Sequence, residues 1–178
     1  MATKSTQGKF AIEIEPREFK DLISILRTLD KEESQKVRDG ALPLSKRLAG
    51  QLQMFAMVAP APQTRLVAQS IEAKRDRLIR VDIGGKKPVG RAYRSRQKQN
   101  KSGTGKLIKA PAGALLWGTE YGSHPGTDSI GRKFTRRFVV GRNRDGYWIN
   151  PAVDFYAPVV AREYAQMLKD VIQENKLD

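Results

Sequence analysis

The sequence predicts an α+β fold in which a small mixed or antiparallel β-sheet is packed by amphipathic helices from both ends of the chain. Apolar residues recur every three or four positions in residues 18–30 and again in residues 151–175, a spacing that gathers them on one helix face. Between these segments lie short stretches that are bounded by glycines. Some of these stretches are apolar and others alternate apolar and charged residues, and both patterns are typical of strands. Hydrophobic residues make up 39% of the 178 residues and cysteine is absent, so we expect a modest core without disulfides.

The amino-terminal third is predicted to hold a short strand and two helices. Residues 9–14 (KFAIEI) alternate apolar and charged positions, which is typical of a strand. A proline then opens a helix over residues 16–30, because proline is tolerated in a first helical turn. A second helix is expected over residues 31–58, with a break near residues 40–43, where glycine and proline occur. The prolines of residues 59–64 (APAPQT) end that helix.

The sheet is predicted to come from the middle of the chain. We expect strands at residues 77–83, 115–121 and 134–140, and a short helix or turn at residues 65–73. A Gly84-Gly85 turn signal follows the first of these strands. One domain is expected, with these parts: a helical region at 16–58, a sheet region at 77–150 with a basic insertion at 86–109, and a carboxy-terminal helix at 151–175 within residues 1–178.

The last predicted element is the carboxy-terminal helix. Asn150 is placed to cap it and Pro151 to occupy its first turn. Pro158 lies inside the helical pattern, so it either kinks the helix or delays its start to about residue 157.

Positive charge is concentrated in one third of the chain. The net charge is +14, and residues 86–144 contain 15 Lys and Arg against two acids, whereas the rest has 18 bases and 17 acids. Residues 86–109 alone have nine bases, no acid and few apolar side chains, which predicts a long loop or arm. Such a concentration of positive charge favours binding to a polyanion or to an acidic protein surface. The alternative is a solvated loop without a partner. The candidate contacts are Lys86, Lys87, Arg91, Arg94, Arg96, Lys98, Lys101, Lys106, Lys109, Arg132, Lys133, Arg136 and Arg137.

No constellation of residues predicts catalysis, a metal or a cofactor. The only histidine, His124, lies in WGTEYGSHPG without a nucleophile elbow, so we expect a loop residue and no enzyme. The acids Glu120, Asp128, Asp145 and Asp154 lack the spacing of a known metal site, and SGTGKL departs from the phosphate-loop pattern. No small-molecule ligand is expected. The sequence also shows no signal-peptide pattern and no membrane-length apolar run, so a soluble, non-exported protein is expected.

The order of the motifs resembles the neck proteins of long-tailed bacteriophages, and more narrowly the tail-completion family of the head-to-tail connection. The matching stretches are APAPQT at 59–64, WGTEYG at 117–122 and YWINPA at 147–152, and the likeness covers about residues 19–168. The chain departs from the pattern in the length and basicity of residues 86–109, and in a longer segment between Gly122 and Tyr147.

This resemblance implies a structural virion protein, made in the host cytoplasm, that forms a ring in the neck around the DNA channel. A homo-oligomer is expected, with a hexamer preferred, and the implied partners are other neck proteins, the tail terminator or tail tube, and viral double-stranded DNA. The bases then face either the channel or acidic neighbours. The alternative is a sequence-nonspecific nucleic-acid-binding protein that uses residues 86–144. The candidate subunit-interface residues are Trp117, Glu120, Tyr121, Tyr147 and Trp148.

Overall fold

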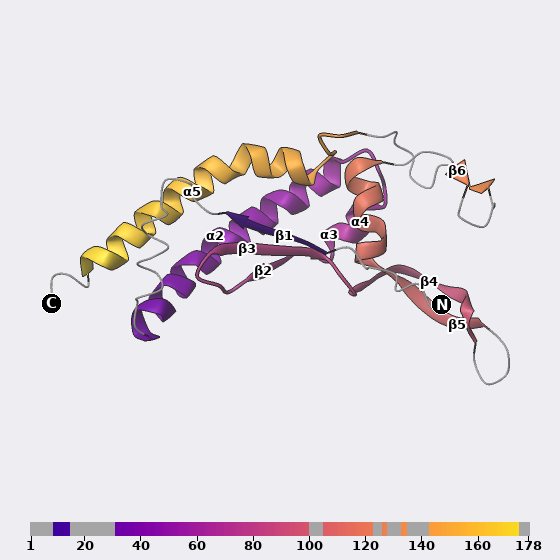
Figure 1. Cartoon of the computed structure of the whole chain (residues 1–178), viewed down its shortest axis with the longest axis horizontal. Coiled ribbons are helices and arrows are strands. Elements are labelled where there is room, and N and C mark those ends of the chain that lie inside the picture. Colours follow the sequence, from indigo (N-terminus) through magenta and orange to yellow (C-terminus); the bar gives the residue numbers. More distant parts are fainter. Residues whose placement is uncertain are drawn as a thin grey trace. The chain divides into compact units, whose positions relative to one another are not determined.

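The chain combines helices with short antiparallel strands (Figure 1), which confirms the predicted α+β class. This computed structural model describes residues 9–14, 31–99, 105–122, 126–127, 133–134 and 143–174. The described elements are, in order, β1 (Lys9–Ile14), α2 (Lys31–Val58), α3 (Thr64–Ala68), β2 (Glu72–Lys74), β3 (Ile79–Gly84), β4 (Pro88–Gln99), β5 (Gly105–Pro111), α4 (Ala112–Tyr121), β6 (Gly126–Thr127), β7 (Lys133–Phe134) and α5 (Ile149–Glu174).

The described strands form three small sheets. One has the order β1-β3-β2, with β2 antiparallel to β3 and Ala73 opposite Val81. The others are the β4-β5 hairpin and the β6-β7 pair. β1 and β3 confirm two of the predicted strands, and α3 confirms the predicted short helix.

The chain divides into two compact units that differ in charge. What we call the basic unit comprises Met1–Phe10, Met57–Ser70 and Ile83–Tyr147, and the helical unit comprises Ala11–Ala56, Ile71–Asp82 and Trp148–Asp178. The basic unit has 18 Lys and Arg against 3 Asp and Glu, a net charge of +15. The helical unit has 15 against 16, a net charge of −1. The whole positive excess therefore belongs to one structural unit.

Two long antiparallel helices dominate the helical unit. Side chains of α2 and α5 meet along their length: Phe55 packs edge-on against Tyr156 at 6.2 Å between ring centroids, and Arg47 pairs with Glu163 at 2.6 Å. Figure 1 shows α5 running alongside α2. The buried stripe of α2 includes Val37, Ala41, Leu48 and Leu52, so these helices are held by apolar burial at helical spacing.

The interior prolines of these helices, Pro43 and Pro158, are accommodated without a break. α2 is continuous through the predicted break at residues 40–43, and α5 begins at Ile149, so the predicted delay to residue 157 is also wrong. Gly40 has a packing reason instead, because a Cβ there would lie 2.9 Å from Met167 Sδ of α5. Burial of one face of each helix outweighs the local cost of Pro43 and Pro158.

The segment predicted as a strand at residues 115–121 is the helix α4. Its buried residues Ala112, Leu115, Leu116, Thr119 and Glu120 fall at i, i+3, i+4, i+7 and i+8, which is the spacing of a helix face. The Gly84-Gly85 turn does not pair β3 with β4, since these strands belong to different sheets. The turn and the residues after it bond to the start of α4 instead. The Gly85 carbonyl accepts a hydrogen bond from Gly113 N–H at 3.0 Å, and the Lys87 carbonyl accepts one from Ala112 N–H at 2.8 Å.

The described part of the chain tests only some of the sequence predictions. The helix predicted at 16–30, most of the strand predicted at 134–140, and His124 lie outside the described residues. None of the described helices combines the length and apolar character needed to cross a membrane.

Candidate functional site

Most of the segment predicted to be a long loop or arm, residues 86–109, belongs to the strands of a β-hairpin, which we call the arm (residues 88–111). β4 and β5 pair antiparallel, with Val89 opposite Ala110 and Arg94 opposite Leu107. The base of the arm is fixed to the basic unit, since Val89 is buried. Gly90 has φ +73° and lies so close to α3 that a Cβ would come within 3.1 Å of Leu66 Cδ1. A register shift between Val89 and Tyr93 follows, so the arm bends as it leaves the base.

Beyond this bend, both faces of the arm are exposed. The pair Tyr93 and Ile108 shares one face with Lys106, and the pair Arg94 and Leu107 shares the other with Lys109, because side chains alternate along a strand. Tyr93 and Leu107 are 50% and 59% exposed. Figure 1 shows the hairpin projecting from α3 and α4. Each face therefore offers both apolar surface and positive charge.

The structure places six of the predicted basic contacts at the surface of one region. Lys86 and Lys87 lie in the turn that precedes β4, and Arg91, Arg94, Lys106 and Lys109 are exposed on the two strands. Arg96 and Lys98 lie on β4 and Lys133 on β7. Lys101, Arg132, Arg136 and Arg137 lie outside the described residues.

A pocket adjoins α4 in the same unit. Two rows of residues run side by side along this helix at i, i+4 spacing: Trp117 with Tyr121, and Gly118 with Gly122. The two aromatic rings are stacked, with centroids 5.6 Å apart and planes 18° from parallel. The helix ends at Gly122, which has φ +73° and whose N–H bonds to the Gly118 carbonyl.

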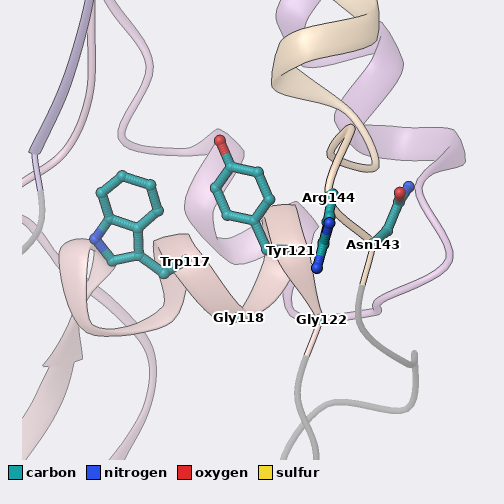
Figure 2. A pocket seen from close by; sticks show the side chains of 6 residues that line it. All are labelled: Trp117, Gly118, Tyr121, Gly122, Asn143 and Arg144. Atoms are coloured by element: carbon teal, nitrogen blue, oxygen red, sulfur yellow. The ribbon is translucent and has the colours of Figure 1, made fainter.

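The far wall of the pocket comes from the chain returning toward α5. Asn143 N–H donates to the Tyr121 carbonyl at 2.9 Å, which ties the returning chain to the end of α4. The Asn143 side chain folds the following turn, since Oδ1 accepts from Asp145 N–H and Nδ2 donates to the Gly146 carbonyl. The exposed Arg144 completes a pocket of about 650 Å³ (Figure 2).

The predicted interface residues separate into surface and core. Trp117 is 50% exposed, and Tyr121 and Tyr147 are half-buried. Glu120 and Trp148 are fully buried, which differs from the interface prediction, because a buried side chain offers no surface to a neighbouring subunit. Glu120 is the first acid after Asp82 in the sequence, and it lies on the inner face of α4 with Thr119.

The described residues contain no group of three or more His, Asp or Glu side chains that could hold a metal ion. Gly118 and Gly122 of the pocket were not among the predicted site residues, and neither were Asn143 and Arg144. In the sequence, Asn143 and Arg144 belong to the turn-forming stretch NRDG, but nothing in the sequence places this stretch beside Trp117. Trp117 and Tyr121 stack as neighbours four apart on a helix, whereas residues 115–121 were predicted to form a strand.

Comparison of the chain with protein families, with curated proteins and with solved structures found no match.

Proposed function

We propose that this chain is a structural subunit of the bacteriophage neck, a head-to-tail connector or tail-completion protein that assembles into a ring around the DNA channel. The observation that carries the proposal is the arm, whose two faces are exposed and carry apolar as well as basic side chains. The order of motifs that resembles the tail-completion family supports the same function.

The physical argument starts from the stability of the arm. A two-stranded hairpin is marginally stable when neither face is covered, so the arm gains most of its order from whatever covers it. Ring subunits provide such a cover, because a closed ring is built from two different faces that meet between neighbours. An arm that reaches the next subunit fits this arrangement.

The side chains of the arm favour a protein surface over DNA as its main contact. Phosphates are neutralised by Arg94 or Lys106, but they offer no apolar surface to the exposed Leu107 or to the ring of Tyr93. An acidic surface with an apolar centre satisfies both kinds of residue. We therefore place the arm on a neighbouring neck subunit, with the remaining bases of the unit available to DNA in the channel.

Two arm variants and a charge-matched control test this function. Tyr93→Ser with Leu107→Ser removes the apolar contacts, and Arg94→Glu with Lys106→Glu and Lys109→Glu reverses the charge. Lys36→Glu with Lys46→Glu and Lys169→Glu changes the total charge equally, using exposed bases of the helical unit. Light scattering and native mass spectrometry report ring formation, alone and after mixing with tail-less heads and head-less tails.

We expect both arm variants to lose assembly and the control to keep it. We also expect the apolar variant to keep its affinity for duplex DNA, measured by fluorescence anisotropy at several salt concentrations. A chain that stays monomeric at high concentration and associates with neither heads nor tails would refute the connector function. If it also bound arbitrary duplex DNA tightly as a monomer, the alternative of a nonspecific nucleic-acid-binding protein would replace it.

A further inference from the structure

The pocket beside α4 is not used by the arm, and its lining has a chemistry of its own. It combines two stacked aromatic rings, two glycines, an amide and a guanidinium: Trp117, Tyr121, Gly118, Gly122, Asn143 and Arg144. We infer that this pocket binds an unstacked base of single-stranded nucleic acid, with Arg144 contacting an adjacent phosphate. This site goes beyond the connector function and does not depend on ring assembly.

The aromatic pair fits a planar ligand. A cavity of about 650 Å³ lies in the range of small-molecule sites and has room for one base and its sugar. Trp117 is half exposed although tryptophan is usually among the more buried residues. Its near-parallel stacking on Tyr121 holds both rings in one orientation, so their planes form a fixed platform. Bases stack on such platforms in proteins that bind single strands.

The glycine row keeps the space beside the platform open. Gly118 lies inside α4 and does not have a positive φ, so the backbone does not require glycine there. A helical glycine costs about 1 kcal/mol relative to alanine, and at this position it leaves the pocket without a side chain. Figure 2 shows Trp117 and Tyr121 on one side of α4, with Arg144 beyond Tyr121.

Charge and geometry together select the class of ligand. The unit around the pocket carries +15, which favours an anion, and Arg144 is exposed at the pocket's edge. An acidic peptide satisfies the charge but has no π face for the stacked rings. Bases of a duplex are already stacked on one another, so the pocket fits a single strand.

The test compares two oligonucleotides with equal phosphate charge. One is a twelve-residue oligothymidylate, and the other is an abasic strand of the same length; binding to the full chain is measured by fluorescence anisotropy. We expect the base-bearing strand to bind ~5-fold to ~150-fold more tightly, the range that one stacked base provides. Trp117→Leu keeps apolar bulk but removes the larger ring, and we expect it to abolish this ratio.

Two further variants separate the roles of the lining residues, and a third serves as a control. Arg144→Gln should weaken binding to both strands and reduce the salt slope by about 0.7, the value for one phosphate contact of a single strand. Gly118→Ala should lower the affinity for the base-bearing strand without lowering the melting temperature, because alanine improves helix propensity while it narrows the pocket. Phe155→Leu, at a 69% exposed aromatic of the helical unit, is the matched control and should change neither strand's affinity.

Equal affinity of the parent chain for the two strands would overturn the inference, and so would a preference that survives Trp117→Leu. Displacement of the base-bearing strand by polyglutamate of equal charge as effectively as by unlabelled oligothymidylate would assign the pocket to acidic peptides instead. Charge reversal on the arm should weaken both strands equally and leave their ratio unchanged. Because this ratio is measured on the isolated chain, it is independent of whether rings form.

Discussion

Tyr164 is predicted to make the stability of this protein fall at high pH. Its side chain is 1% exposed, and its hydroxyl donates to the Arg77 carbonyl at 2.6 Å, which joins α5 to the segment before β3. Burial raises the pKa of Tyr164 to about 12, and the negative charge of Asp76 acts in the same direction. We propose Tyr164→Phe as the perturbation, because it removes the hydroxyl and keeps the ring.

The magnitude follows from the two pKa values. The folded chain holds the Tyr164 proton more tightly than the unfolded chain, whose pKa is 10.0. This contribution to the free energy of unfolding is therefore complete below pH 10 and is lost as the pH rises through 12. The difference between the two pKa values corresponds to roughly 3 kcal/mol in total, of which roughly half is lost by pH 11. Loss of the hydrogen bond itself costs about 1 kcal/mol at pH 8.

Urea unfolding of the parent chain and of Tyr164→Phe at pH 8 and pH 11 measures both quantities. We expect the variant to be less stable by about 1 kcal/mol at pH 8. The parent chain should then lose roughly 1 to 2 kcal/mol more than the variant by pH 11, so that its advantage in stability disappears. All ionisable groups other than Tyr164 are the same in the two proteins, so their contributions cancel in the difference in stability. A difference in stability that stays the same at both pH values would refute the reasoning.

Two glycines and one buried serine give opposite expectations for substitution by alanine. Gly50→Ala should stabilise the chain by about 0.5–1 kcal/mol, since Gly50 lies within α2 with nothing within 4 Å of an added Cβ. Gly90→Ala should destabilise the chain by about 1–2 kcal/mol, because the left-handed backbone and the contact with Leu66 both oppose a side chain. Thermal melting of the two variants checks the sign of each change in stability. Ser45→Ala should cost about 1 kcal/mol in urea unfolding, as its hydroxyl accepts from Arg80 N–H at 3.1 Å; unchanged stability would show that this link of α2 to β3 contributes nothing.

Helices with a long periodic stripe of apolar residues were predicted correctly, whereas a helix formed by a short apolar run was predicted as a strand. α2 and α5 each present a stripe over more than twenty residues, and both were predicted. The segment of α4 is ten residues long and bounded by glycines, and such a run is compatible with a buried strand or a buried helix. Its helical state is supported by the carbonyls of Gly85 and Lys87, which bond to its first N–H groups. Those carbonyls are distant in sequence, so the local pattern could not show them.

The composition of residues 86–109 predicted exposure correctly but not strand pairing. The scarcity of apolar side chains predicted a long loop or arm, yet β4 and β5 form a hairpin. Their hydrogen bonds join backbone groups and need no apolar residue. The pocket was missed for a related reason. Its aromatic row and its arginine lie more than twenty residues apart in sequence, and only the bond from Asn143 to the end of α4 brings them together.

The separation of charge between the two units explains why both proposals concern anionic partners. The helical unit has a large buried core, including Trp148, Tyr164 and Leu48, and a net charge of −1, so charge repulsion does not oppose its compact state. The basic unit buries Ile83, Val67 and Leu116 and carries +15, and repulsion among its bases opposes its compact state. An anionic partner removes this repulsion and covers the arm at the same time. A partner that binds the folded basic unit would therefore also stabilise it.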